Sequence, residues 1–189
     1  MSADAVLDMP RLTPETAEPK SRELMNAAKE RLGFVPNMYA EMGQLPELLE
    51  AYMSAYEGFR NAAGFTPPEQ EVVFLAISRF NGCDYCMAAH SMIAEKVSKV
   101  PADSLSALRE GHPLPDAKLD ALATFARRMV ESRGTPSGDE VRAFLDAGFE
   151  QKHVLGIILA IGVKTYSNYT NHVAGTEIDE AFAGHEVAA

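Results

Sequence analysis

Two cysteines and a histidine occupy one short segment, where their types and spacing could support chemistry at sulfur. Cys83 and Cys86 form a C-x-x-C pair, and His90 follows four residues after the second cysteine. Because residues three and four apart lie on one face of a helix, the three side chains would share a stripe. Asn81-Gly82 breaks the chain just before the pair, which predicts a helix start near Cys83.

A helix start favours the thiolate form of a nearby cysteine. Unpaired backbone N–H groups and the positive end of the helix dipole stabilise a negative charge there. A C-x-x-C in this position commonly has one cysteine with a pKa well below about 8.5. His90 can take the proton of Cys86 or hold it through a hydrogen bond. Since the thiolate is the reactive form, the pattern favours redox chemistry at sulfur.

A carboxylate in the preceding helix is a further candidate for this site. The helix predicted to end near Phe80 is apolar on most sides, yet it contains Glu71. A buried carboxylate is costly unless it is paired. If the chain doubles back at Asn81-Gly82, Glu71 can meet His90 and orient or deprotonate it.

Two other interpretations of these residues stay open. Paired cysteines on one helical face can be small buried residues of the core. Zinc binding is the other, because Cys83, Cys86, His90 and Glu71 supply four side chains of the ligand type. A closed zinc site more often takes two separated pairs of ligands, and the sequence contains no second C-x-x-C and no H-x-x-H.

Composition and charge limit the class of protein. The chain has 189 residues, of which 47% are apolar and 23% charged, as in an ordinary globular protein. A net charge of −10 argues against sequence-independent binding of nucleic acid and against binding to an anionic membrane. No apolar run reaches the roughly 18 residues of a membrane span, and the N-terminus lacks the apolar core of a secretory signal. We therefore expect a cytoplasmic protein with reduced thiols.

Helical spacing of apolar residues recurs along most of the chain. We expect residues 1–19, which contain three prolines, to form an irregular arm, and residues 20–189 to form one domain. Helices are predicted over residues 21–32, 38–42, 46–63, 67–80, 83–98, 116–132, 137–149 and 151–174, with short ones from 101 and over 178–182. No segment alternates like a strand, so the predicted fold class is an all-α bundle of about eight helices.

The last long helix carries polar and aromatic residues close together. Tyr166, Asn168, Tyr169, Asn171 and His172 lie within two turns of one another. Tyrosines spaced by three residues more often belong to a core or an interface than to a catalytic site. This spacing gives little support for a catalytic role of His172.

The motif as a whole resembles that of a known family. Glu71, Cys83, Cys86 and His90 match the E-x11-C-x2-C-x3-H core of the AhpD-like alkylhydroperoxidases, members of the carboxymuconolactone decarboxylase superfamily. Weaker similarity to the peroxidase-related branch extends over residues 32–37, 46–49 and 168–178. The resemblance implies an all-α, oligomeric protein, and we expect no cofactor.

The resemblance also implies a role for each motif residue. Cys86 would attack the peroxide O–O bond and become a sulfenic acid, and Cys83 would resolve it as a disulfide. Glu71 and His90 would form the proton relay that activates Cys86. The implied function is a thiol-dependent peroxidase that reduces alkyl and other hydroperoxides. Tyr85 is a departure, because characterised members often have histidine immediately before the second cysteine.

The departure at Tyr85 motivates an alternative function. A thiol–disulfide exchange or redox-sensing protein would have little peroxidase activity, and a metal-binding helical bundle is a third hypothesis. Decarboxylase members of the superfamily generally lack the cysteine pair, which argues against that chemistry here. The expected partners are a hydroperoxide substrate, an external dithiol reductant and further copies of the chain as a dimer, trimer or hexamer.

Overall fold

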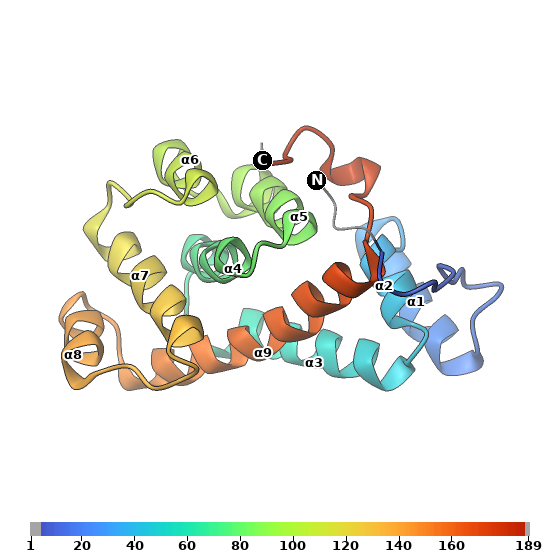
Figure 1. The fold of residues 1–189 in the computed structure, drawn as a ribbon, viewed down its shortest axis with the longest axis horizontal. Coiled ribbons are helices and arrows are strands. Elements are labelled where there is room, and N and C mark those ends of the chain that lie inside the picture. Colours follow the sequence, from blue (N-terminus) through green and yellow to red (C-terminus); the bar gives the residue numbers. More distant parts are fainter. Residues whose placement is uncertain (1–4, 188–189) are drawn as a thin grey trace.

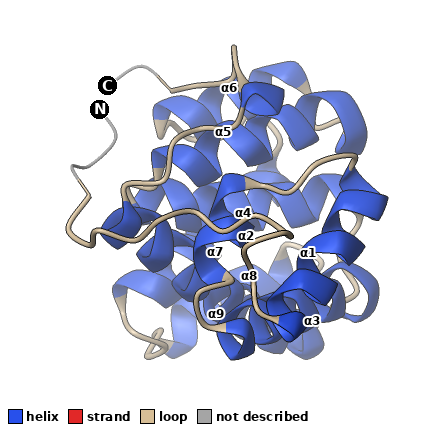
Figure 2. Ribbon diagram, turned by 90° about the vertical axis from the view of Figure 1, so that its right-hand side faces the viewer, coloured by secondary structure: helices blue, strands red, loops and turns tan. Residues whose placement is uncertain are grey.

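The structure is all-α, as the sequence predicts. The computed structural model describes residues 5–187, and these residues contain no strand. The helices are α1 (Pro19–Leu32), α2 (Asn37–Met42), α3 (Pro46–Ala62), α4 (Pro67–Asn81), α5 (Asp84–Ile93), α6 (Ala102–Glu110), α7 (Ala117–Glu131), α8 (Gly138–Asp146) and α9 (Gln151–Ala174). Apart from α5, each agrees with a predicted segment to within about one turn. Figure 2 shows only helices and loops.

The central helix of the fold is α4. It packs against α7, α5, α9 and α6, which surround it in Figure 1. Every residue from Glu69 to Ser78 is buried. A helix that is apolar on most sides needs neighbours all round, which explains why this segment lies in the centre. The two long helices α3 and α9 run side by side below it in the same view.

Local sequence signals set both ends of α4. At its start, the Glu69 carboxylate accepts a hydrogen bond of 2.8 Å from the backbone N–H of Thr66. At its end, Gly82 has a φ of +69°, a left-handed conformation that glycine adopts readily. The chain therefore turns sharply enough for α5 to pack back against α4, and the turn delivers Cys83 to the start of α5.

The segment predicted as one helix over residues 83–98 divides into two parts. Regular α-helix ends at Ile93 and is followed by a π-helical turn, η1 (Ala94–Ser98). Such widened turns occur frequently at functional sites. In this one, the hydroxyl of Ser98 donates a hydrogen bond of 3.4 Å to Glu71 Oε1.

The N-terminal segment is irregular up to the start of α1. Residues 5–18 contain no helix, and α1 begins at Pro19, slightly earlier than predicted, because proline suits the first helical position. Arg11 in this segment forms an ion pair of 2.6 Å with Glu177, which holds the segment against the residues that follow α9. Residues 1–4 of the predicted arm lie outside the described residues. Within residues 5–187, no helix is both long and apolar enough to cross a bilayer.

Candidate active site

The two cysteines are buried free thiols at the start of α5. Cys83 is the N-cap residue of α5 and Cys86 lies one turn further on. Their exposed fractions are only 1% and 2%. The side-chain amide of Asn171 in α9 lies 3.5 Å from Cys83 Sγ and 3.3 Å from Cys86 Sγ. The Nδ2 group of Asn171 therefore contacts both sulfurs.

The surroundings of the two sulfurs give them opposite protonation states. Burial tends to raise the pKa of Cys86, but a hydrogen bond from Cys83 and the positive charge of Lys164 lower it from 9.0 to about 6. Hydrogen bonds from Ser167 and Asn168 act in the same direction. The hydrogen bond to Cys86, followed by burial, raises the pKa of Cys83 far above its ordinary range. At neutral pH, Cys86 is therefore a thiolate and Cys83 a thiol.

Lys164 is a cation enclosed in the core beside this thiolate. Its side chain in α9 is 1% exposed, and its Nζ has no hydrogen-bond partner among the described residues. The ammonium lies 4.6 Å from the centre of the Phe74 ring, a cation–π contact. Burial lowers the pKa of Lys164, and the charge of Cys86 opposes that effect. Each charge therefore stabilises the other in a site with little water.

Glu71 and His90 meet where α4 packs against α5. The distance from His90 Nδ1 to Glu71 Oε2 is 2.8 Å, and both residues are buried. Glu71 also forms an ion pair with Arg60 of α3. Burial opposes ionisation of this carboxyl, yet His90 and Arg60 together hold its pKa below the ordinary value. Glu71 is therefore a carboxylate with partners on α3, α5 and η1.

The carboxylate sets the tautomer of His90. Burial first, and then the charge of Lys164, lower the pKa of His90 to about 4, so the ring is neutral at pH 7. Since the Glu71 carboxylate can only accept a hydrogen bond, Nδ1 of His90 must carry the proton. Nε2 is then free to accept a proton from another group.

A mainly apolar pocket joins His90 to Cys86. No direct hydrogen bond links His90 to either sulfur within residues 5–187, but His90 and Cys86 both line a pocket of about 420 Å³. Other parts of its wall are apolar or aromatic and come from several elements: Phe34, Met38, Tyr52, Tyr56, Ile93 and Phe182. A small organic molecule in this pocket would contact the thiolate and the imidazole together.

Tyr85 lines the same pocket as His90, and its hydroxyl has a structural partner, Asp179. Its hydroxyl donates a hydrogen bond of 2.5 Å to Asp179 Oδ2, and burial raises the pKa of Tyr85 well above its ordinary value. Asp179 also accepts hydrogen bonds of 3.1 and 3.2 Å from the backbone N–H of Asn37. The hydrogen bond from Tyr85 to Asp179 therefore holds the segment after α9 against the wall of the pocket.

A separate pocket lies on the Cys83 side of the dithiol. It has a volume of about 230 Å³ and is bounded by the turn before α5, the end of α9 and the C-terminal residues Glu186 and Val187. Cys83 lines this pocket but not the apolar one, whereas Cys86 lines the apolar pocket but not this one. The two sulfurs therefore border different cavities.

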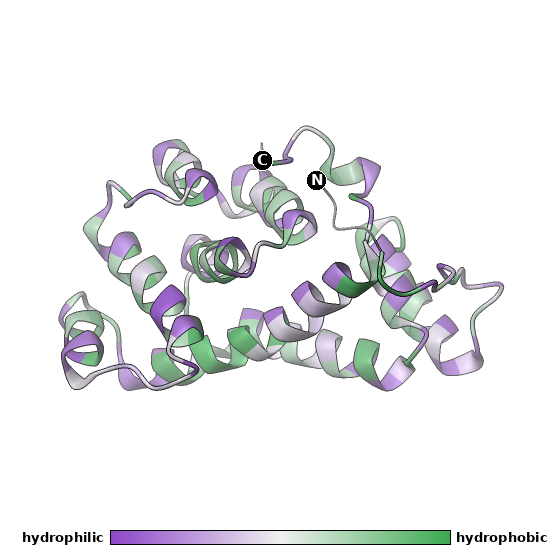
Figure 3. Ribbon diagram, in the orientation of Figure 1, coloured by the Kyte–Doolittle hydropathy of each residue, from purple (hydrophilic) through white to green (hydrophobic). Residues whose placement is uncertain are grey.

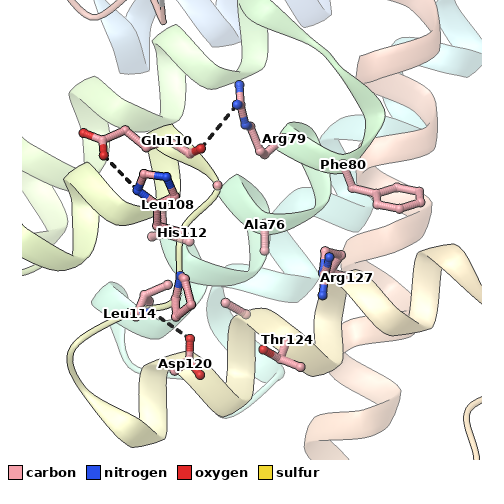
Figure 4. Close-up of a pocket in the computed structure, with 13 residues that line it drawn as sticks. Ala76, Arg79, Phe80, Leu108, Glu110, His112, Leu114, Asp120, Thr124 and Arg127 are labelled. Atoms are coloured by element: carbon pink, nitrogen blue, oxygen red, sulfur yellow. Dashed lines mark hydrogen bonds and ion pairs between the residues drawn. The ribbon is translucent and has the colours of Figure 1, made fainter.

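Another pocket, of about 430 Å³, lies between α4, α6 and α7 and contains none of the predicted site residues (Figure 4). Several of its polar side chains have local partners. Arg79 donates a hydrogen bond of 3.4 Å to the carbonyl of Glu110, and Asp120 accepts one of 2.7 Å from Leu114. We assign no part of the chemistry to this pocket.

The zinc interpretation finds no support in the described part of the chain. Within residues 5–187, no group of three or more His, Cys, Asp or Glu side chains is placed to hold a metal ion. Glu71 and His90 are already paired with each other, and Glu71 also binds Arg60.

Several residues of the site come from helices that the sequence did not connect to the motif. Lys164, Asn168 and Asn171 follow one another at intervals of four and three in α9, so they share the face that is buried. Polar residues at this spacing in an otherwise apolar helix are the signal that could have identified them. Arg60 offers no such signal, because its role depends on how α3 packs.

Comparisons with known proteins agree with this architecture. The model of the carboxymuconolactone decarboxylase family matches residues 46–126, a stretch that contains the whole motif from Glu71 to His90. Over these residues the chain is similar to the carboxymuconolactone decarboxylase family. Among curated protein sequences, none matches this chain.

Solved structures of the AhpD-like fold superimpose over almost the whole chain. An uncharacterised peroxidase-related protein from Ralstonia eutropha JMP134, an alkylhydroperoxidase AhpD core, has a TM-score of 0.81 at 19% identity, covering 95% of this chain and 96% of that one. A peroxidase-related protein from Silicibacter sp. TM1040 has a TM-score of 0.77 at 21% identity, covering 95% and 94%. An alanine variant of the debrominase Bmp8, solved with 2,3,4-tribromopyrrole, has a TM-score of 0.76 at 18% identity, covering 95% of each chain. At such identities the similarity establishes the fold.

Proposed function

We propose that this protein is a thiol-dependent peroxidase that reduces hydroperoxides, alkyl hydroperoxides among them, through a cycle of the Cys83–Cys86 dithiol. The supporting observation is a pair of buried free thiols one turn apart that share a contact with the Asn171 amide, in surroundings that lower the pKa of Cys86 and raise that of Cys83. A thiolate that attacks and a thiol that resolves are the two groups that such a cycle needs. The AhpD-like fold of peroxidase-related proteins agrees with this proposal.

In the proposed first step, the Cys86 thiolate attacks the terminal oxygen of the hydroperoxide in the apolar pocket. The S–O bond forms, the O–O bond breaks, and Cys86 becomes a sulfenic acid. The departing alkoxide takes up one proton and leaves as the alcohol. Glu71 and His90 act as the relay: when Cys86 starts as a thiol, Nε2 of His90 passes its proton to the alkoxide, and when Cys86 starts as a thiolate, the proton comes from solvent through the same nitrogen.

In the second step, Cys83 attacks the sulfenic sulfur of Cys86. The S–S bond forms, and the thiol proton of Cys83 leaves with the hydroxyl group as water. An external dithiol then reduces the disulfide and becomes a disulfide itself, which restores both thiols. Thiols that must return to the reduced state suit the cytoplasm, where we expect this protein to act.

A Cys83→Ser variant tests the division of roles between the cysteines. Without the resolving thiol, one equivalent of peroxide should leave a stable sulfenic acid at Cys86 that dimedone traps, and turnover with a dithiol should fall sharply. Mass spectrometry of the dimedone adduct measures this result, with wild-type protein as the control that forms a disulfide instead. Failure to trap an adduct after peroxide is consumed would contradict the resolving role of Cys83.

The main alternative is thiol–disulfide exchange or redox sensing with little peroxidase activity. Exposed fractions of 1% and 2% keep both sulfurs from direct contact with a protein surface, which favours small reactants. A peroxide-consumption assay with a dithiol donor separates the two functions. Negligible peroxide turnover together with a reduction potential like that of thioredoxin-type couples would favour the alternative.

We also propose that the chain forms a homo-oligomer through the outer face of α9. This face carries a row of exposed apolar or aromatic residues: Leu155, Ile158, Leu159, Tyr166, Tyr169 and Val173. The first half of α9 is coloured largely as hydrophobic in Figure 3, and most of its second half is pale or purple. Since the row contains no charged side chain, the same face of a second copy would complement it. Tyr169→Glu should reduce the molar mass measured by light scattering, and a single-chain mass for the wild type would contradict the proposal.

A further inference from the structure

We propose that Arg31 selects hydroperoxides that carry a carboxylate, and that the preferred substrate is a long-chain carboxylic acid with its hydroperoxide group far from the acid group. The inference rests on the proposed function and names the substrate class of the apolar pocket. It starts from the charges of the pocket wall. Among the described residues that line this pocket, Arg31 is the one arginine, and none is aspartate, glutamate or lysine. The pocket therefore combines apolar walls with one fixed positive charge.

Arg31 has no carboxylate partner at ion-pair spacing on its own helix. It lies in the last turn of α1 and is exposed to solvent. The residues three and four positions before it, where a partner on the same helix face would lie, are Ala28 and Ala27. Arg60 of α3 differs, because its charge is taken up by the ion pair with Glu71. Arg31 is therefore available to bind the anionic group of a substrate.

The guanidinium of Arg31 lies close to Tyr39 in the pocket wall. Burial raises the pKa of Tyr39 to about 12, while the charge of Arg31 and a hydrogen bond from it act in the opposite direction. Tyr39 lines the pocket and is only 5% exposed, so this contact places the guanidinium at the rim of the pocket. A guanidinium has five N–H donors, and those that Tyr39 does not use can hold a carboxylate in a bidentate pair.

A row of aromatic rings separates this cation from the reacting groups. The ring of Tyr39 lies 5.5 Å from that of Tyr52, which lies 5.9 Å from that of Tyr56. The ring of Tyr56 in turn lies 6.5 Å from the imidazole of His90. A substrate that contacts both the cation and the thiolate must extend along several of these rings, so its carboxylate and its peroxide are many bonds apart. A pocket of about 420 Å³ with apolar walls suits the chain between them.

The carboxylate of the substrate takes no part in bond making. Cys86 attacks the terminal oxygen as in the proposed first step, the S–O bond forms and the O–O bond breaks. The product is the hydroxy acid, whose hydroxyl proton passes through His90. Because the ion pair with Arg31 is the same before and during this step, it strengthens the binding of substrate and transition state equally. We therefore expect Arg31 to act on KM and not on kcat.

Protection of Cys86 from alkylation tests the binding site without peroxide. Decanoate and decan-1-ol have the same chain length, and either one in the pocket should slow the reaction of Cys86 with iodoacetamide in the reduced protein. Arg31→Gln should raise the decanoate concentration for half-maximal protection by about threefold relative to that of decan-1-ol, a change typical of one exposed ion pair. Lys29→Gln is the matched control and should leave this ratio unchanged, because Lys29 is an exposed cation of the same turn that does not line the pocket.

A pair of hydroperoxides tests the choice of substrate. The 13-hydroperoxide of linoleic acid and its methyl ester differ in the charge of the acid group. With a dithiol donor in excess, the ratio of kcat/KM for the acid to that for the ester should be about threefold lower in Arg31→Gln than in the wild type, through a higher KM for the acid. Arg31→Lys, which retains the charge, should keep most of the ratio, and Lys29→Gln should not change it.

An acid-to-ester ratio that is unchanged in Arg31→Gln, or that falls equally in Lys29→Gln or in Arg31→Lys, would overturn this inference. Absence of protection by decanoate in the wild type would overturn it as well. Failure of the proposed function would look different. In that case decanoate would still protect Cys86 in a manner that depends on Arg31, but neither hydroperoxide would be consumed.

Discussion

Replacing Cys86 with serine should abolish peroxide turnover, lowering it by at least about a thousandfold. The serine hydroxyl stays protonated at neutral pH, so the nucleophile that Lys164 and Asn171 stabilise is absent. Because serine is close to cysteine in size and the site is buried, the fold should be retained. The measurement is peroxide consumption with a dithiol donor, alongside thermal unfolding to verify the fold.

Cys83→Ser is the matched control for this experiment, since it removes a neighbouring buried thiol of the same pair. It should still consume one equivalent of peroxide in a single turnover, whereas Cys86→Ser should consume none. Peroxide consumption by Cys86→Ser at the wild-type rate would disprove the assignment of Cys86 as the attacking thiol.

Replacing Lys164 with methionine should lower peroxide turnover at pH 7, by up to about thirtyfold. The wild-type pKa of about 6 leaves Cys86 mostly as thiolate at this pH. Without the buried cation, the hydrogen bonds from Cys83, Ser167 and Asn168 still lower the pKa of Cys86, but they alone oppose the effect of burial. The pKa should therefore rise towards the ordinary value of about 8.5, where only a few per cent is thiolate. Methionine preserves the unbranched shape of the side chain and can pack against Phe74.

The pH dependence of alkylation at Cys86 measures this effect directly. In the wild type, the rate with iodoacetamide should be constant above pH 7 and fall as the pH drops through about 6, because the thiolate becomes protonated. In Lys164→Met the fall should begin at a higher pH, nearer to 8.5, with the rate recovering above it. Lys152→Met, a change at an exposed lysine of the same helix, should behave like the wild type. An unshifted profile in Lys164→Met would contradict the role of Lys164.

Most of the fold could be predicted from the sequence because its helices carry local signals. Prolines in first turns, Gly82 at a sharp reversal and a regular apolar spacing all act within a few residues. The approach of Glu71 to His90 was also predictable, since the reversal lies between them and a carboxylate in an apolar helix needs a partner. The π-helical turn at η1 could not be predicted from the sequence, because a widened turn depends on the packing around it.

The chemical state of the thiols could not be predicted from the motif alone. A helix start was expected to stabilise one thiolate, and the structure adds Lys164, which contributes its charge from α9. Nor does the motif reveal that the two sulfurs border different cavities, because residues near the C-terminal end of the chain close one of them. Both features require contacts between segments far apart in the sequence.

The position of Lys164 has a consequence for the chain during its synthesis. Cys86 leaves the ribosome well before α9 does, so at that stage the thiol has no cation beside it. An unfolded cysteine keeps the ordinary pKa of about 8.5 and is mainly protonated in the cell. The thiol of Cys86 would therefore react slowly with oxidants while the chain is being made. It would become reactive only when α9 packs against the rest of the protein. Activation of the nucleophile thus becomes a result of completing the fold.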